Sequence, residues 1–404
     1  MYSLSPQPKK LMDFPVEMLI EILSSMDVDT LFRMSHVNRR LKEIVTMHWP
    51  SIFMPIIKRD FSPVELLFRV FDVCSGKAVT ALDHICDGDV FFGQQLVCSH
   101  RGCGKDVDSR WTTQLSSNDA LTVFKVCLAV KKWEREFHRL RFARYPQYSR
   151  SLRPHELERL RLGLYVWWRF ARYFHGGFQF DEGFEDQGRF WLRRPDSPDI
   201  RCNFMRQYST TQLHEIMDVW NTIRSAVGRE VCPSIVTIRE QSDNMLSRAE
   251  ASRIGWGDPI ENDFILATIM KLRPEDILHL LVFRHRYTTK QSLIQFIRLK
   301  NPWIEQSIET FTEATETVLR ERERMLIDEK GSDALDPGLY FPQSGFPFRH
   351  GGVVDHGDRN IERLRAKYAH DAGKGTHYST VNEEYADGLY LRAAVPMGQL
   401  VATS

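Results

Sequence analysis

The stretch FPVEMLIEILSSMDVDTLFRMSHVNRRLKEIV, residues 14–45, decides how the N-terminal part of the chain folds. Pro15 suits the first position of a helix, because its backbone angle is already helical and its missing N–H is not needed there. At about 100° per residue, the apolar side chains between Val16 and Met26 cover an arc of about 200°, roughly twice what one packed face requires. The first helix is therefore predicted to carry more apolar surface than one packed face uses.

Two further short helices are predicted to follow. Asp27 and Asp29 can cap a helix over residues 30–36, and Asn38 stands at the start of a third helix over residues 39–49. A unit of about 45 residues lies near the lower size limit for independent folding, where little apolar surface is fully covered internally. We expect the surplus to mark a helix-to-helix protein interface.

The residues of this segment resemble the F-box, a three-helix module. The resemblance covers residues 11–57 and rests on the pattern P-x-E-x-L-x-x-I-L, followed by apolar and basic residues at set positions. The pattern begins at Pro15 and continues with Met26, Leu31, Val37, Asn38, Arg39, Arg40 and Leu41. Phe14 stands where the family usually has Leu, which keeps the apolar character of that position.

The resemblance implies docking to the Skp-family adaptor of an SCF-type cullin-RING ubiquitin ligase, as its substrate-receptor subunit. An unknown target protein would be the second partner. The partner-binding residues that it implies are Phe14, Pro15, Glu17, Leu19, Ile22, Leu23, Leu31, Val37, Asn38, Arg39 and Leu41. A scaffold protein that uses the same module without directing degradation is the alternative, and the two differ in whether a target's half-life changes when the chain is removed.

The bulk composition is typical of a globular protein with two or three domains. The chain has 404 residues, 42% of them hydrophobic and 26% charged, and its net charge of +1 supplies no general attraction to nucleic acid or membranes. Seven cysteines without an Asn-x-Ser/Thr acceptor favour reduced thiols. Because the first residues lack the apolar stretch of a signal peptide, we expect a cytoplasmic or nuclear protein with no membrane partner.

The fold is predicted to be mainly α. We expect a disordered leader over residues 1–10, the F-box over 11–57, a helical target-binding region over 58–330 and a Gly/Pro/aromatic-rich tail over 331–404. Residues 58–116 suggest loops around one or two short strands. Helices are predicted over 117–145, from Pro154 to the glycines at 176 and 177, and over 209–227, 260–271, 274–284, 289–299 and 302–329.

One cluster has residue types that bind zinc. Cys98 and Cys103 flank His100, and His84 and Cys86 lie upstream. Structural zinc sites usually use two pairs of ligands separated by two to four residues, which this spacing meets poorly. We therefore favour ordinary thiols over a zinc site, and predict no metal and no cofactor.

Residues 131–172 have a composition that nucleic-acid binding would also require. They contain 12 Lys or Arg against 4 acids, interleaved with aromatic residues such as Trp133, Trp167 and Trp168. Residues 302–336 have 10 acids against 4 bases. Pairing between these two helical regions, or solvated faces, is the favoured interpretation, with the aromatic residues in the core.

Motifs of catalysis are missing from the sequence. It contains no G-x-S-x-G, H-E-x-x-H, P-loop or dinucleotide-binding glycine pattern. His214 and Glu215 begin a His-Glu pair, but Asp218 stands where a second zinc-binding histidine would be needed, so we interpret this segment as a surface helix. The alternating charges of residues 320–324 suggest another solvated helix. We predict a non-catalytic subunit.

Overall fold

The computed structural model describes residues 14–74, 117–143, 149–175, 198–287, 289–302 and 309–330, with Leu11, Pro146 and Ile304. Every regular element in these ranges is a helix, so the predicted fold class is confirmed. The predicted leader over residues 1–10 and the tail over 331–404 lie outside the described residues. The helices are α1 (Val16–Ser25), α2 (Val28–Val37), α3 (Arg39–Met47), α4 (Trp49–Asp60), α5 (Val64–Cys74), α8 (Ser117–Arg141), α9 (Pro154–Phe174), α10 (Pro198–Arg206), α11 (Thr210–Glu230), α12 (Ile235–Gln241), α13 (Arg248–Ile254), α14 (Pro259–Ile269), α15 (Pro274–Val282), the 3-10 turn η5 (Arg284–Arg286), α16 (Lys290–Lys300) and α17 (Phe311–Lys330).

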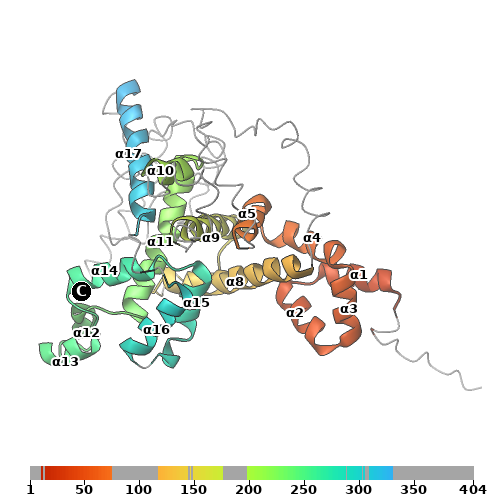
Figure 1. Ribbon diagram of the computed structural model, residues 1–404, viewed down its shortest axis with the longest axis horizontal. Coiled ribbons are helices and arrows are strands. Elements are labelled where there is room, and N and C mark those ends of the chain that lie inside the picture. Colours follow the sequence, from red (N-terminus) through yellow and green to blue (C-terminus); the bar gives the residue numbers. More distant parts are fainter. Residues whose placement is uncertain are drawn as a thin grey trace, which may run out of the picture.

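Helices α1–α5 form the N-terminal part of the molecule (Figure 1). Their buried side chains, among them Leu19, Leu31 and Phe71, belong to one hydrophobic cluster, which we call the N-terminal core. Side chains from α8 and α9, such as Val126 and Trp168, complete the same cluster. The first helices therefore share their core with elements that follow much later in the sequence.

Helix α8 joins the two parts of the molecule. Figure 1 shows it running from the N-terminal helices to the larger helical region. Val123 and Val130 of this helix belong to the N-terminal core, while Trp133 and Phe137, nearer its C-terminal end, belong to a larger cluster, the central core. The Trp133 indole also donates a hydrogen bond to the Pro274 carbonyl at the start of α15, with Nε1 and O 3.1 Å apart.

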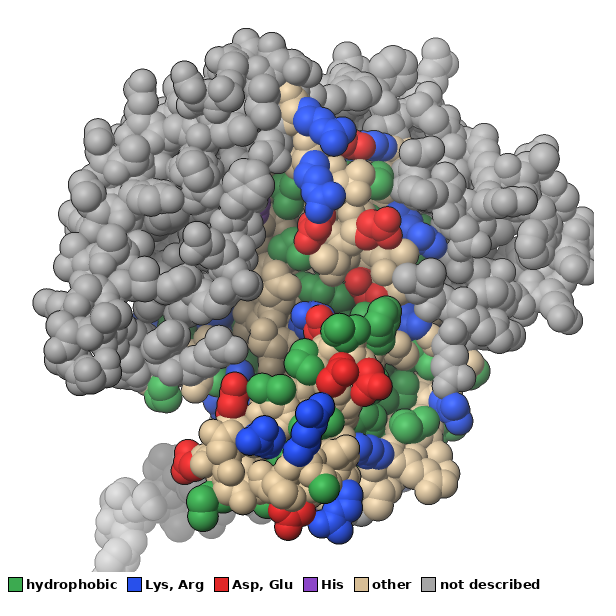
Figure 2. Space-filling view, turned by 90° about the vertical axis from the view of Figure 1, so that its left-hand side faces the viewer, with side chains coloured by type: hydrophobic (Ala, Val, Ile, Leu, Met, Phe, Trp, Pro, Cys, Tyr) green, Lys and Arg blue, Asp and Glu red, His purple; other side chains and the backbone are tan. Residues whose placement is uncertain are grey.

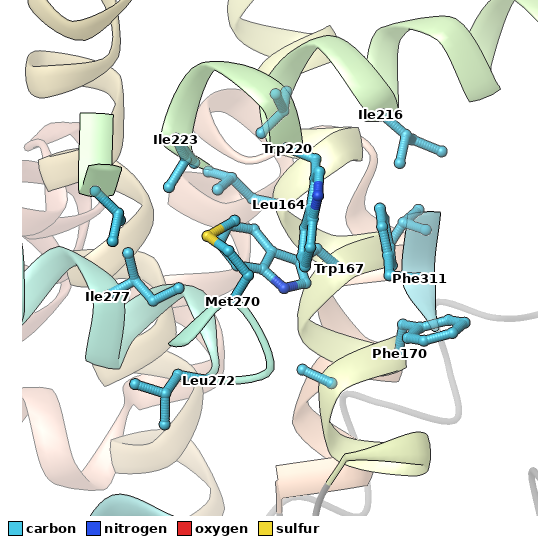
Figure 3. Packing of buried hydrophobic residues seen from close by; sticks show 14 of the residues in the cluster. Leu164, Trp167, Phe170, Ile216, Trp220, Ile223, Met270, Leu272, Ile277 and Phe311 are labelled. Carbon is cyan, nitrogen blue, oxygen red and sulfur yellow. The ribbon is translucent and has the colours of Figure 1, made fainter. Parts of the chain in front are cut away.

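Aromatic rings from several helices meet in the central core (Figure 3). Trp167 from α9 meets Trp220 from α11 edge-on, with ring centroids 4.8 Å apart. Phe311 from α17 stacks on Trp220 at 4.6 Å and meets Phe170 at 5.1 Å. Helices far apart in the sequence are thus held together by rings whose burial and edge-on contacts both stabilise the fold.

Helices α9 and α11 approach each other closely at Gly163. A Cβ atom at this position would lie 2.6 Å from Cγ2 of Val219, closer than real carbon atoms pack. Glycine usually weakens a helix by about 1 kcal/mol relative to alanine. Here its missing side chain is what allows the two helices to pack at this distance.

The structure corrects several predicted elements. The helix predicted over residues 39–49 ends at Met47, and Trp49 begins α4, whose second residue is a proline suited to the start of a helix. Residues 64–74, expected to be loops or strands, form α5. The helix predicted from residue 302 begins instead at Phe311, where Glu309 accepts a hydrogen bond from the Phe311 backbone N–H.

Helix α14 is apolar on both faces. Leu266 and Ile269 are buried, whereas Ile260 and Phe264, one turn apart, are each 71% exposed. Figure 2 shows the side of the molecule on which α14 lies, where apolar side chains gather among charged ones. These two side chains form an exposed apolar surface far from α1.

Candidate functional site

The outer face of α1 is the first candidate for a binding surface. Pro15, Met18 and Ile22 follow one another at helical spacing, so they share one side of the helix. Pro15 is exposed, Met18 is 45% exposed and Ile22 is half-buried. Leu19 and Leu23 lie about 90° further round the helix and are 0% and 1% exposed. Helix α1 thus has an inner apolar stripe that packs the N-terminal core and an outer apolar stripe in contact with water.

An arginine of α4 holds the C-terminal end of α1. The Arg59 guanidinium donates to the backbone carbonyls of Ser25 at 3.2 Å and Met26 at 2.7 Å, which the helix itself leaves without partners. Asp60 accepts two further hydrogen bonds from Arg59, at 2.9 Å each, and this interaction raises the pKa of Arg59. The outer stripe therefore lies on a helix whose end is tied to its neighbour.

The second candidate surface is the junction between α2 and α3. Val37 is 83% exposed, and Asn38 caps α3 by accepting hydrogen bonds from the backbone N–H groups of Arg40 at 2.8 Å and Leu41 at 3.3 Å. Arg39 and Glu43 form an exposed ion pair. An apolar side chain so exposed beside a fixed helix start is available to a partner.

The other end of α2 is also fixed by a cap, as the sequence predicted. Asp27 accepts hydrogen bonds from the backbone N–H of Thr30 at 3.0 Å and from its hydroxyl at 2.6 Å. These bonds favour the carboxylate and lower the pKa of Asp27.

The residues that the resemblance implied as partner-binding divide into two groups. Four of them, Leu19, Leu23, Leu31 and Leu41, are at most 1% exposed and pack the N-terminal core. The other seven reach the surface: Pro15, Glu17, Val37 and Arg39 are exposed, and Phe14, Ile22 and Asn38 are half-buried. Two exposed methionines, Met18 and Met47, were not among the implied residues, although Met18 lies in the apolar arc visible in the sequence. The division shows which side chains remain open to a partner.

Much of the apolar surplus is covered by the chain itself, contrary to expectation. Phe124 of α8 packs against Phe32 of α2 and Phe53 of α4, with ring centroids 5.4 and 5.2 Å apart. Arg135 of α8 forms an ion pair with Asp29. The sequence argument missed this cover because α8 lies about a hundred residues further along the chain. The outer stripe of α1, Val37 and Met47 are among the apolar side chains of the first helices that remain open.

In the basic aromatic segment over residues 131–172, the aromatic rings that the structure describes are not open for base stacking. Its described aromatic residues, Trp133, Phe137, Phe142, Tyr165, Trp167, Trp168 and Phe170, are all buried. Several of its arginines pair with acids of this chain, for example Arg141 with Asp218 at 3.0 Å and Arg161 with Glu134 at 2.6 Å. Neither Asp218 nor Glu134 belongs to residues 302–336, the acidic region with which pairing was predicted. Internal packing therefore accounts for the aromatic residues and several of the bases.

The helix that carries His214 is not a surface helix. Helix α11 packs along α9, and His214 and Glu215 are 9% and 5% exposed. Glu215 pairs with Arg159 at 3.4 Å. The segment of alternating charges also differs from expectation, because Arg322 is 6% exposed and donates to the Tyr208 carbonyl at 2.6 Å. His214, Glu215 and Arg322 therefore pack against neighbouring helices, whereas Arg320 and Arg324 are exposed as expected.

No group of three or more metal-binding side chains occurs in the part of the chain that the structure describes. His84, Cys86, Cys98, His100 and Cys103 lie outside it. None of the described helices is long and apolar enough to cross a membrane.

Comparison with protein families gives a match to the F-box domain over residues 11–52. The matched range comprises α1, α2, α3 and the first residues of α4. The chain is therefore an F-box domain-containing protein, and the resemblance seen in the sequence is confirmed. Searches of curated proteins and of solved structures found no match.

Proposed function

We propose that this chain is a non-catalytic substrate-receptor subunit of an SCF-type ubiquitin ligase. F-box domains generally bind Skp-type adaptors, and the F-box at residues 11–52 supports the same role here. The observation that carries the proposal is the outer stripe of α1, where Pro15, Met18 and Ile22 remain open although the inner stripe is buried.

The described residues after the F-box would hold the target protein. They form a large helical region with its own core and its own exposed apolar and charged surfaces. Such a receptor accelerates ubiquitin transfer by bringing target lysines close to the ubiquitin-charged enzyme, which is a proximity effect and needs no catalytic group in this chain.

Co-purification with a recombinant Skp-family adaptor tests the docking step. Met18→Asp combined with Ile22→Asp places two charges on the outer stripe and leaves the N-terminal core intact. Each apolar side chain buried in an interface contributes about 1.5–3 kcal/mol, so we expect at least about a tenfold loss of adaptor affinity.

The matched control is Ile260→Asp combined with Phe264→Asp on α14, which makes the same kind of change on an exposed apolar surface elsewhere. We expect this variant to bind the adaptor like the wild type. Circular dichroism should show unchanged helix content in both variants. Equal capture of the adaptor by both variants would overturn the docking proposal.

A further inference from the structure

A long segment near the end of the described helices carries no acidic residue. Residues 277–302 contain five Lys or Arg and no Asp or Glu. They form most of α15, η5 and α16. In a chain with a net charge of only +1, this is a local excess of positive charge.

Four rings come together within this segment. His279 of α15 stacks on Phe296 of α16 with centroids 5.1 Å apart, and its Nε2 lies 3.0 Å from the Tyr287 hydroxyl. Phe283 lies 4.7 Å from His279 between ring centroids. All four side chains are half-buried, so the rings form part of the molecular surface.

Two exposed cations lie over these rings. Arg286 is 4.4 Å from the Phe283 ring centroid, and Lys300 is 5.6 Å from that of Phe296. We call the six residues His279, Phe283, Arg286, Tyr287, Phe296 and Lys300 the basic aromatic surface. Leu299, beside it in sequence, is 79% exposed and offers an apolar contact.

The acid that contacts this surface, Asp276, already has partners within the fold. Asp276 is 3% exposed and pairs with Arg273 at 2.9 Å as well as with Lys300 at 3.6 Å. The pKa of His279 is lowered, first by burial and then by Lys300, Arg286 and Lys132, while Asp276 opposes the shift. Around His279 the cations from three elements therefore outweigh the single acid.

We propose that the basic aromatic surface binds an acidic segment of a target protein, in which carboxylates flank an apolar side chain. The carboxylates would pair with Arg286 and Lys300, and the apolar side chain would contact Leu299 and the edges of the rings. The inference rests on the proposed function, because the bound segment would belong to the protein presented for ubiquitination.

A peptide fits this surface better than a nucleic acid does. The rings pack on one another and are half-buried, so they offer edges more than open faces for base stacking. The exposed side chain next to the cations is aliphatic, and a peptide can supply an apolar partner for it.

Fluorescence anisotropy with the full-length protein tests the inference. The probe is a fluorescein-labelled peptide that alternates glutamate with leucine and alanine, and its comparison is the same peptide with glutamine in place of glutamate. Arg286→Glu combined with Lys300→Gln should weaken binding of the acidic peptide by up to about fivefold for each lost ion pair. Binding of the glutamine peptide should not change.

The control variant, Arg320→Glu combined with Arg324→Gln, changes the net charge equally on α17, which lies far from α16 (Figure 1). We expect it to bind the acidic peptide like the wild type. Equal binding by both variants, or equal affinity for both peptides, would overturn the inference.

The same measurements distinguish other occupants. Tighter binding of single-stranded RNA or of phosphatidylserine vesicles than of the peptide would also overturn the inference, and assign the surface to that ligand. If Glu383→Gln, Glu384→Gln and Asp387→Asn together raise peptide affinity, the surface belongs to an acidic segment of this chain, and the assignment to a target protein is overturned.

Adaptor co-purification keeps this inference separate from the proposed function. If the wild type captures the adaptor but does not bind the acidic peptide, the inference fails and the proposed function stands. If the peptide binds but the adaptor is not captured, the surface is a binding site and the ligase role fails.

Discussion

His175 is a buried neutral histidine that makes stability depend on pH. Burial lowers its pKa to about 3, and the positive charges of Lys271 and Arg201 act in the same direction. Its backbone carbonyl accepts a hydrogen bond from Asn301 at 2.8 Å, which ties the end of α9 to the end of α16. The imidazole therefore stays neutral in the folded protein under conditions in which the unfolded chain binds a proton.

We expect the free energy of unfolding to fall as the pH drops from about 6.5 to about 3, because only the unfolded state protonates this residue in that window. The slope contributed by one histidine is at most about 1.4 kcal/mol per pH unit. His175→Phe should remove this contribution. Urea unfolding at about pH 7 and about pH 5 gives the free energy of unfolding of the wild type and of the variant. If the difference between the two proteins is the same at both pH values, His175 is not the source of the pH dependence.

Interactions between residues close in the sequence could be predicted, whereas interactions between distant residues could not. Asp27 and Asn38 were predicted as helix caps and are caps, because an N-cap is a local interaction between a side chain and the next turn. Arg59 was not predicted to hold the end of α1, because its partners lie more than thirty residues away in the chain. Which apolar side chains of α1 and α2 stay exposed could not be predicted either, since burial depends on α4 and α8.

At the scale of elements, α9 and α11 approach each other closely at Gly163. Gly163→Ala would normally stabilise a helix by about 1 kcal/mol. Here the new Cβ would lie 2.6 Å from Cγ2 and 3.0 Å from Cβ of Val219, a branched side chain that rotates with difficulty. We expect a net loss of about 1–3 kcal/mol in the free energy of unfolding, measured by urea denaturation.

Val219→Ala provides the matching test of this contact. In that background the alanine at position 163 has space, so Gly163→Ala should cost less, with a coupling energy of about 1 kcal/mol or more. If Gly163→Ala costs the same in both backgrounds, the contact with Val219 does not explain its effect.

Helix periods predicted the longer helices of the larger region, but the short helices α10, α12 and α13 were missed, as was α5. The buried side chains of α5 include the adjacent pairs Leu67 with Phe68 and Val70 with Phe71. Such doublets place apolar residues on two faces, so the periodicity is weak and cannot distinguish a buried helix from a strand. The charged residues of α11 led to the wrong prediction of a surface helix. Ion pairs such as that between Glu215 and Arg159 allow a helix with polar residues to lie inside the fold.

At the scale of the whole molecule, the F-box does not have a separate core. The N-terminal core includes side chains of α5, α8 and α9. A fragment of residues 11–57 would lose these contacts, and α4 would end before its last turn at Asp60. We therefore expect this fragment, in the absence of adaptor, to be much less stable than the same residues in the full chain.

Amide hydrogen exchange measures this difference. In the full chain the amides of Leu23 and Leu31 should be strongly protected from exchange, whereas in the fragment they should exchange much faster. The reason is that the fragment loses about 25 cal/mol of stabilisation for each Å² of apolar surface that α5, α8 and α9 no longer cover. Equal protection in fragment and full chain would show that the first helices are stable without α8.

The length of α8 has a geometric consequence for the proposed ligase. Its 25 residues extend about 37 Å at 1.5 Å each, and both of its halves are anchored in packed hydrophobic clusters. It behaves as a stiff rod, unlike a flexible tether. A captured protein would be presented at a set height and angle from the adaptor, so ubiquitin would reach only those lysines that fall within a narrow zone.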